Sequence, residues 1–424
     1  MCLGNEAMKK YFYIFIFCFA IFLIHLISIR HGIYGDGNGF YAYTQALLFD
    51  KGLNFGPIYN ALEHFQGVKG EFSRFFWDRT INPYPIGTGI VWIPSVALIS
   101  LFFQDRFSMV FEVGPGITGI LLVLGGMYFL EKYLQNFFSP KIAILSVMFI
   151  FFASNLFYYS SFEPALSHQP SFFIISFLLY KSYKFDKKFI NFFLFGALSG
   201  FLFTIRVADI LFLIPIYWQI LKNSPSLKNW VTTFISAFIF SLPIFWSYYV
   251  MAGNPLRISY FDRGLSTYSF NVSSIINFFF TPKRGLFTWT PIFFFSFVGL
   301  IKSRKYAFLI SLTFLILFVS FWASVSVEFG QRWIIGGVPY LAFGLASFIE
   351  KLNTKKIAVM FILLLTWNLL TIFQFYFNEQ NVIKNDNLTF SMFFKGQFES
   401  PVKAFEIIKD KGLNYFFYKK ILYY

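Results

Sequence analysis

Long apolar runs recur along the whole chain and constrain its fold more than any other feature. The runs cover residues 11–29, 86–103, 109–130, 142–159, 165–181, 189–205, 207–221, 230–251, 287–301, 306–322, 333–349 and 357–377. Most of them reach the length of about 17–25 residues that a helix needs to cross a bilayer core of about 30 Å. We therefore predict an all-α polytopic membrane protein with about 11–13 transmembrane helices.

The composition agrees with a membrane protein and excludes a nucleic-acid-binding one. Only 13% of the 424 residues are charged and 57% are hydrophobic, whereas a soluble protein usually carries about 25% charged residues. The net charge is +15, but the lysines form small groups between apolar runs and are not gathered on one face. Two cysteines, Cys2 and Cys18, provide neither a disulfide framework nor a metal-binding spacing.

The basic residues predict how the chain is oriented, because cytoplasmic loops are rich in Lys and Arg. Lys9 and Lys10 place the start of the chain inside and residues 30–85 outside, and the run 11–29 lacks a cleavage site, so we predict a retained first span. Further loops are predicted to be cytoplasmic at 181–188, 222–229, 302–305 and 350–356, and outside at 160–169, 252–286, 323–332 and 378–424. Residues 1–377 are predicted to form one transmembrane domain, and 378–424 a short outer tail.

One stretch conflicts with this orientation. Starting from an outer loop at 30–85, two spans at 86–103 and 109–130 would return the chain to the outside, yet "EKYLQNFFSPK" at 131–141 looks cytoplasmic. Either 86–103 is re-entrant, as Pro94 near its middle suggests, or the loop at 131–141 breaks the charge rule. The sequence leaves both alternatives open.

The first outer loop is predicted to begin with a helix. Within residues 38–50, apolar side chains follow the i, i+3, i+7, i+8 spacing of a half-buried helix, at Phe40, Tyr43, Leu47 and Leu48. We expect this helix to lie along the membrane surface. Asp36 is placed to cap its start, and Gly52 is a natural stop.

Asp36 is also a candidate functional residue. Its carboxylate lies within a few residues of a span end, between Gly35 and Gly37, and the two glycines let a ligand or another part of the chain approach the backbone closely. A positioned carboxylate of this kind can act as a general base. Capping alone also accounts for an Asp at this place, so the sequence leaves both roles open.

Glu163 and His168 lie in or beside the outer loop "YYSSFEPALSHQPSFF" at 158–173. Ionisable residues near membrane depth are functional candidates. The alternative is a hydrogen-bonded pair that fixes two helix ends.

Lys283 and Arg284 in "FFFTPKRGLFTWTPIF" at 278–293 are basic residues on the predicted outer side, which indicates an anionic partner such as a phosphate. The alternative is that they snorkel to lipid headgroups.

Glu328 and Arg332 are four residues apart beside an outer span mouth, in "SVEFGQRWIIGGVPYLAFGLA". The two side chains can simply form an i,i+4 ion pair. Alternatively Arg332 holds a phosphate and Glu328 orients it. Arg206 is a further cation at a span end, and Asp209, three residues later, is its potential partner.

Taken together, five motifs resemble the GT-C class of integral-membrane glycosyltransferases. In order they are "GDGNGFYAYTQALLFDKGLNF", "NPYPIGTGIVWIPSVAL", "FEPALSHQPSFF", "TPKRGLFTWTPI" and "FGQRWIIGGVPYLAFGLA". The sequence is similar to the branch that contains protein O-mannosyltransferases and the lipid A aminoarabinose transferase, and especially to its uncharacterised bacterial members. The resemblance covers most of residues 1–350 and implies a GT-C-like fold whose first outer loop carries surface-lying helices.

The resemblance also implies site residues. An acidic residue at the start of the first outer loop is the family's catalytic base, and Asp36 occupies that place. The family often has a second acid directly after it, where this chain has Gly37, which argues against a paired-carboxylate or metal-binding version of the site. Glu163 matches a further family acid in the next outer loop. No cofactor is predicted; a divalent metal is compatible with the sequence but is not indicated by it.

The implied reaction transfers a sugar from a polyprenyl-phosphate-linked donor in the bacterial inner membrane, on its outer face, to a lipid, glycan or protein acceptor. Asp36 would take a proton from the acceptor hydroxyl or amine. The cations available to hold the departing phosphate are Lys283, Arg284, Arg332 and Arg206, with His168 and Glu328 as further substrate-binding candidates. Two alternatives remain open: a transporter or lipid-linked-sugar flippase, and a family member without activity.

Overall fold

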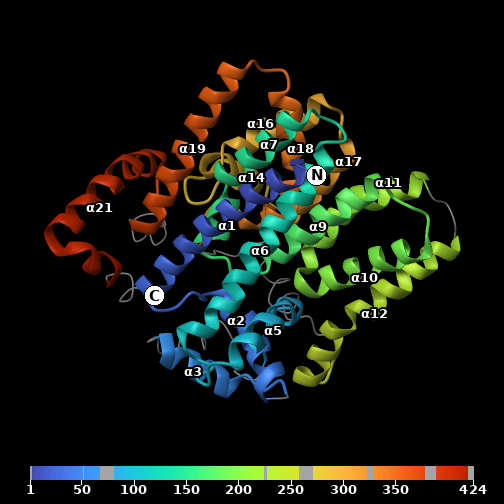
Figure 1. The fold of residues 1–424 in the computed structure, drawn as a ribbon, viewed down its shortest axis with the longest axis horizontal. Coiled ribbons are helices and arrows are strands. Elements are labelled where there is room, and N and C mark those ends of the chain that lie inside the picture. The colour runs from blue at the N-terminus through green and yellow to red at the C-terminus, as the bar shows by residue number, and fades with distance from the viewer. Residues whose placement is uncertain are drawn as a thin grey trace.

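The computed structural model describes residues 2–50, 52–66, 81–223, 227–256, 271–321, 328–377 and 388–418, and every regular element within them is a helix (Figure 1). In chain order the elements are α1 (Cys2–Ile29), α2 (Asp36–Gln45), η1 (Ala46–Asp50), α3 (Gly56–Gln66), α5 (Gly87–Ser100), α6 (Met109–Leu134), α7 (Pro140–Phe152), α8 (Asn155–Ser161), α9 (His168–Tyr183), α10 (Phe189–Ile205), η2 (Val207–Leu213), α11 (Ile214–Asn223), α12 (Leu227–Ala252), α14 (Val272–Phe280), α15 (Leu286–Trp289), α16 (Ile292–Lys302), α17 (Tyr306–Phe321), η4 (Arg332–Gly337), α18 (Val338–Ile349), α19 (Thr354–Phe377) and α21 (Phe390–Tyr418). Six predicted segments extend in part outside the described residues: 30–85, 222–229, 252–286, 306–322, 323–332 and 378–424.

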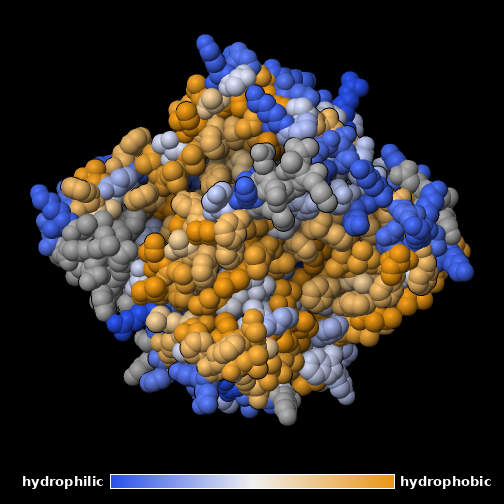
Figure 2. Space-filling view, viewed as in Figure 1, coloured by the Kyte–Doolittle hydropathy of each residue, from blue (hydrophilic) through white to orange (hydrophobic). Residues whose placement is uncertain are grey.

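Several of these helices are long and apolar enough to cross a membrane. Five satisfy this by length and composition among the described residues, namely Lys9–Ile29, Met109–Leu134, Leu227–Ala252, Arg332–Ile349 and Thr354–Tyr376. The pair α7 and α8, bent by 68°, is either a broken sixth span or a re-entrant loop, and four shorter apolar helices are α5, α10, α16 and α17. Hydrophobic residues cover the middle of the face shown in Figure 2, and hydrophilic ones gather around its edges. The all-helical membrane fold is confirmed, while the number of 11–13 transmembrane helices stays a prediction.

Close backbone contacts hold the helices together. A Cβ atom added at Gly299 in α16 would lie 1.8 Å from the carbonyl oxygen of Gly344 in α18, so only glycine allows this approach. Gly200 in α10 is similarly placed against the carbonyl oxygen of Ala237 in α12, at 2.0 Å. Small residues at helix interfaces are typical of membrane proteins, because dispersion contacts must replace the hydrophobic driving force.

Helix α6 runs antiparallel to α1. At one end, the Lys10 ammonium forms an ion pair with the Glu131 carboxylate. At the other end, the backbone N–H of Gly32, just after α1, donates a hydrogen bond to Glu112 near the start of α6. The chain therefore enters α6 at the same end of the fold at which it leaves α1.

This arrangement resolves the conflict at 86–103 and 131–141. The loop after α5 returns to the predicted first outer loop, where Arg106 forms an ion pair with Asp50 at 2.6 Å. The loop after α6 instead meets two loops that the charge rule assigns to the cytoplasm. The ring of Phe137 makes an edge-to-face contact with Tyr183, and the Lys305 ammonium lies 4.9 Å from the centre of the Phe137 ring. Helix α5 thus begins and ends at the same end of the fold, as in the re-entrant alternative, and 131–141 obeys the charge rule.

The helix expected over 38–50 is present with two differences. It continues beyond Gln45 as a π-helical turn, η1. Its N-cap is Gly35, whose φ of 56° lies in the left-handed region that favours glycine, and no side-chain capping hydrogen bond is formed. The expectation that Asp36 caps this helix is therefore wrong: Asp36 is its first residue, and its carboxylate is directed elsewhere.

The described part of the tail forms helix α21, which packs against α19 and α1 (Figure 1). The side-chain amide of Gln374 donates to the carbonyl oxygen of Phe393 at 3.0 Å, and that of Gln397 donates to the Thr371 hydroxyl at 2.8 Å. These buried contacts join the tail to the helix that precedes it. The division between a transmembrane domain and an outer tail stays a prediction.

Candidate functional site

The carboxylate of Asp36 has two partners that reach it from distant parts of the chain. The Tyr84 hydroxyl, just before α5, donates a hydrogen bond to Oδ1 at 2.6 Å. The Arg332 guanidinium at the start of η4 forms an ion pair with Oδ2. Backbone hydrogen bonds from Gly37 to Tyr34 and from Asn38 to Gly35 close the turn that precedes α2. The turn thus presents a half-buried carboxylate beside a cation.

The segment that carries Arg332 is held by α8. Gly330 has a φ of 61°, so it supplies a left-handed turn between Glu328 and Arg332. The side-chain amide of Asn155 donates to the carbonyl oxygen of Gln331 at 3.0 Å. The Tyr159 hydroxyl accepts the backbone N–H of Phe329, also at 3.0 Å.

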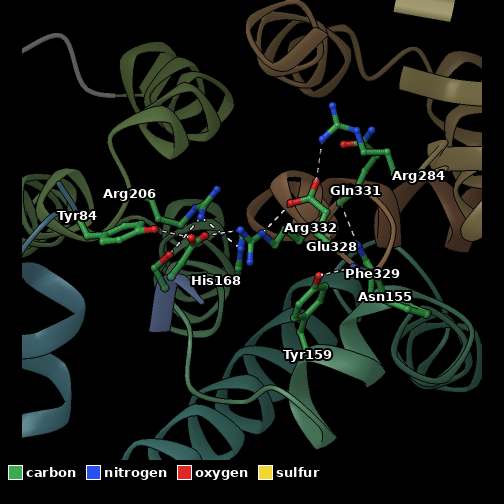
Figure 3. A network of polar contacts seen from close by, with 12 residues as sticks. Tyr84, Asn155, Tyr159, His168, Arg206, Arg284, Glu328, Phe329, Gln331 and Arg332 are labelled. Atoms are coloured by element: carbon green, nitrogen blue, oxygen red, sulfur yellow. Dashed lines mark hydrogen bonds and ion pairs between the residues drawn. The ribbon is translucent and has the colours of Figure 1, made fainter. Parts of the chain in front are cut away.

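Asp36, Arg332, Glu328 and Arg284 form a row of alternating charge through this site, and the last three are labelled in Figure 3. Arg332 pairs with Asp36 on one side, and on the other its Nε lies 2.8 Å from the carboxylate of Glu328. The carboxylate of Glu328 is in turn 3.9 Å from Nη1 of Arg284, between α14 and α15. Only 1% of the Glu328 side chain and 13% of the Arg332 side chain are exposed, whereas 32% of Asp36 is exposed. The row therefore has a buried pair, Arg332 and Glu328, in its middle and a partly exposed side chain at each end, Asp36 at one and Arg284 at the other.

A second cluster of charged side chains, centred on Arg206, lies beside this row. Arg206, at the end of α10, pairs through Nε with Asp209 at 3.0 Å, and its Nη1 is 3.2 Å from the Ser167 hydroxyl. Its guanidinium lies 4.9 Å from the ring centre of Trp333, the residue after Arg332. His168 is 3.4 Å from Nη1 of Arg206 and also interacts electrostatically with Arg332, so it lies between the two clusters (Figure 3).

Glu163 lies in the loop between α8 and α9. It accepts a hydrogen bond from the Tyr158 hydroxyl at 2.6 Å and interacts electrostatically with Arg332. The same loop packs against the start of α2, where a Cβ atom at Gly37 would lie 2.8 Å from the carbonyl oxygen of Ala165. Because of this contact there is no room for a side chain at position 37, the position at which the family that the sequence resembles often has a second acid.

The structure thus brings together most of the residues singled out from the sequence. Asp36, Glu328, Arg332 and Arg284 form the row, and Arg206 and His168 form the adjacent cluster. Lys283 is half-buried in the same turn as Arg284. Both ion pairs considered as alternatives, Glu328 with Arg332 and Arg206 with Asp209, are present. Their presence leaves the proposed roles of these residues untested.

Sequence reasoning missed three side chains at or near this site. Tyr84 occurs within the motif "NPYPIGTG", in which only the prolines and glycines seemed informative. Trp333 directly follows Arg332 and could have been noted as an aromatic neighbour. Glu112 lies within the apolar run 109–130 and was not singled out, although an ionisable residue within such a run is itself a candidate functional residue.

No three His, Cys, Asp or Glu side chains are grouped closely enough to hold a metal ion in the part of the chain that the structure describes. The row of charges instead offers guanidinium groups, which bind phosphate through paired hydrogen bonds.

The fold is that of a GT-C-like membrane protein. It is similar to the crystal structure of ArnT from Cupriavidus metallidurans in the apo state, with a TM-score of 0.54 over 98% of this chain and 75% of the ArnT chain. The two sequences are 12% identical. ArnT is a lipid A aminoarabinose transferase of the GT-C class, so the fold expected from the sequence motifs is confirmed. No protein-family model matches this chain, and neither does any curated protein.

Proposed function

We propose that this protein is a glycosyltransferase that moves a sugar from a polyprenyl-phosphate-linked donor to a hydroxyl or amine acceptor at the outer face of the bacterial inner membrane. The observation that carries the proposal is the contact between Asp36 and Arg332 in a fold similar to that of ArnT. A half-buried carboxylate beside a guanidinium supplies the two groups that the reaction needs: a proton acceptor and a phosphate-binding cation.

Asp36 acts as the general base. The acceptor oxygen or nitrogen attacks the anomeric carbon, the bond from that carbon to the phosphate oxygen breaks, and polyprenyl phosphate leaves. The proton of the acceptor passes to the Asp36 carboxylate. Phosphate is already a good leaving group, so no strong general acid is required. Tyr84, which donates to Oδ1, keeps that carboxylate oriented.

Arg332 holds the donor phosphate, and its present partners suggest how. Its guanidinium lies between the carboxylates of Asp36 and Glu328. A phosphate that arrives at Arg332 can replace Asp36 as the anionic partner, because both present oxygens to the same N–H groups. The exchange frees Asp36 to accept a proton, while Glu328, buried on the other side, keeps Arg332 in place.

The remaining site residues have supporting roles in this proposal. Arg206, His168, Arg284 and Lys283 provide further positive charge and hydrogen-bond donors for the phosphate or the sugar. Glu163, which interacts electrostatically with Arg332, is the second catalytic carboxylate of this proposal. The acceptor is a lipid, a glycan or a protein.

The test is a transfer assay on purified, reconstituted protein with a panel of polyprenyl-phosphate sugars. Release of free polyprenyl phosphate by the wild-type protein, and its loss in Asp36→Asn, would support the proposal. Movement of an intact lipid-linked sugar across the liposome membrane without release would support a flippase instead. If no donor in the panel leads to release or to movement, both the transferase and the flippase functions are contradicted.

A further inference from the structure

The carboxylate of Glu112 is buried at the start of α6 and faces the turn that carries Asp36. It accepts a hydrogen bond from the backbone N–H of Gly32 through Oε2, and it also interacts with the backbone N–H of Ile33. The residue is only 1% exposed. Its other oxygen, Oε1, is buried and accepts no hydrogen bond from the residues that the structure describes.

This arrangement of Glu112 is energetically unfavourable. Burying a carboxyl group with one oxygen left without a hydrogen-bond partner costs free energy whether the group is ionised or protonated, and the contacts with two backbone amides offset only part of that cost. A neutral side chain of similar size would pack at this helix start at lower cost. The position of Glu112 therefore indicates a role that depends on an acceptor at this place, in addition to packing.

The backbone that Glu112 contacts leads directly into the turn before Asp36. The carbonyl oxygen of Ile33 accepts a hydrogen bond from the Gln66 side chain at 2.9 Å, so both edges of this short segment are held. Gly32 is tightly enclosed, since a Cβ atom there would lie 2.9 Å from Leu26. The next three residues form the turn whose left-handed Gly35 points the helix start toward Arg332. A shift at Gly32 would therefore displace the Asp36 carboxylate.

We infer that Glu112 is a positioning residue for the proposed transfer: by fixing the amides of Gly32 and Ile33, it sets the place of the Asp36 carboxylate relative to Arg332. The inference rests on the function proposed above. Glu112 touches no reacting atom in this account and acts only through the turn. A displacement of about 1 Å at a catalytic group can cost about a hundredfold in rate.

The first test separates turnover from binding. Glu112→Gln keeps the shape of the side chain but replaces one carboxyl oxygen by an NH2 group, which accepts no hydrogen bond and disturbs the contact with the two backbone amides. We expect kcat to fall by about tenfold to a hundredfold while donor affinity stays within about twofold. In an Asp36→Asn background, Glu112→Gln should have no further effect, because the group it positions is gone. The matched control is Glu131→Gln, at the opposite end of the same helix, which should leave kcat unchanged.

The second test does not depend on activity. Hydrogen–deuterium exchange should be faster at the amides of residues 31–37 in Glu112→Gln than in the wild-type protein, and unchanged in Glu131→Gln. If exchange is unchanged in Glu112→Gln, the positioning role is refuted. It is also refuted if Glu131→Gln lowers kcat as much as Glu112→Gln does, since the effect is then general destabilisation of α6.

The two tests distinguish the inference from the proposed function. If no donor is consumed by the wild-type protein but exchange at residues 31–37 rises in Glu112→Gln, Glu112 still fixes the turn before Asp36, but the proposed reaction fails. If transfer is observed and depends on Asp36, while neither kcat nor exchange responds to Glu112→Gln, the proposed function stands and the inference fails.

Discussion

The Asp36 carboxylate and the Arg332 guanidinium form an ion pair although they are 296 residues apart in the chain. The pair joins α2, the first helix of the predicted outer loop, to the start of η4, and Tyr84 and Glu328 extend it on either side. A contact of this kind is built by the whole fold and not by either segment alone. It is therefore the place at which the proposed reaction can be tested most directly.

Asp36→Asn should lower turnover by about a hundredfold or more, with little change in folding. Asn has nearly the same shape and can still accept the Tyr84 hydrogen bond, but it cannot take the acceptor proton. The assay is release of polyprenyl phosphate by reconstituted protein, with size-exclusion profile and thermal unfolding measured in parallel.

The chain offers a matched control for this substitution. Asp50 is another aspartate of the first outer loop, is also 32% exposed and also pairs with an arginine, Arg106. Asp50→Asn should leave turnover nearly unchanged. If Asp36→Asn protein folds and keeps near-full activity, Asp36 is not the general base.

Arg332→Lys should weaken donor binding by about tenfold, or about 1.4 kcal/mol, although the charge is kept. Arg332 uses Nη2 toward Asp36 and Nε toward Glu328, and one ammonium group cannot reproduce this fork. Binding of a labelled polyprenyl-phosphate sugar measures the effect. Arg106→Lys is the control and should bind donor normally. Unchanged affinity in Arg332→Lys and in Arg332→Gln would remove this residue from the phosphate site.

Glu328→Gln should be strongly destabilising. From the sequence, Glu328 and Arg332 could have been an exposed i,i+4 pair, worth about 0.3–0.5 kcal/mol. In the structure the Glu328 side chain is almost completely buried, and removing one partner of a buried ion pair usually costs about 3–5 kcal/mol. Chemical unfolding in detergent should show a loss of this size. A double-mutant cycle with Arg332→Gln should give strong coupling, and additive effects would contradict it.

The sequence was sufficient to predict the class of fold and most of the charged residues of the site. Long apolar runs predict helices without any knowledge of tertiary contacts. Charged residues at the ends of these runs are easy to recognise because the runs themselves carry few charges. The cap assignment failed because an Asp beside a helix start looks the same at the N-cap and at the first helical position. Only the backbone conformation of Gly35 distinguishes the two.

Other features could not have been found locally. Tyr84 is one of 25 tyrosines, and nothing around it marks a hydroxyl that reaches Asp36 from 48 residues away. The pairing of Asp36 with Arg332 depends on how α1, α8 and η4 pack. Sequence reasoning placed both residues on the outer side but could not bring them into contact.

Gly37→Glu should not create a working pair of carboxylates at the start of α2. Any side chain at Gly37 places a Cβ atom 2.8 Å from the Ala165 carbonyl oxygen and 3.0 Å from Ile33, and backbone atoms cannot yield as a flexible side chain does. Even Gly37→Ala should lower the free energy of unfolding by about 1–3 kcal/mol. Gly52→Ala, in the same loop but with its nearest neighbour at 3.8 Å, should be tolerated. Stable and fully active Gly37→Ala protein would contradict this steric account.

The last prediction concerns which loops face which side of the membrane. Because α5 begins and ends at the same end of the fold, the loop after it should be outside, together with Asp50. The loop after α6, which contacts two predicted cytoplasmic loops, should be inside. A model in which 86–103 crosses the membrane makes the opposite prediction for the loop after α5.

Single-cysteine labelling distinguishes the two arrangements. In a background without Cys2 and Cys18, Gln104→Cys in the exposed loop after α5 should react with an impermeant maleimide added outside intact cells or right-side-out vesicles, as should Asp50→Cys. Lys141→Cys, exposed at the start of α7, should react only after the membrane is permeabilised. If Gln104→Cys is protected while Asp50→Cys is labelled, α5 crosses the membrane and the re-entrant arrangement is wrong. If Asp50→Cys itself is labelled only after permeabilisation, the orientation is inverted, and the proposed transfer site does not face outward.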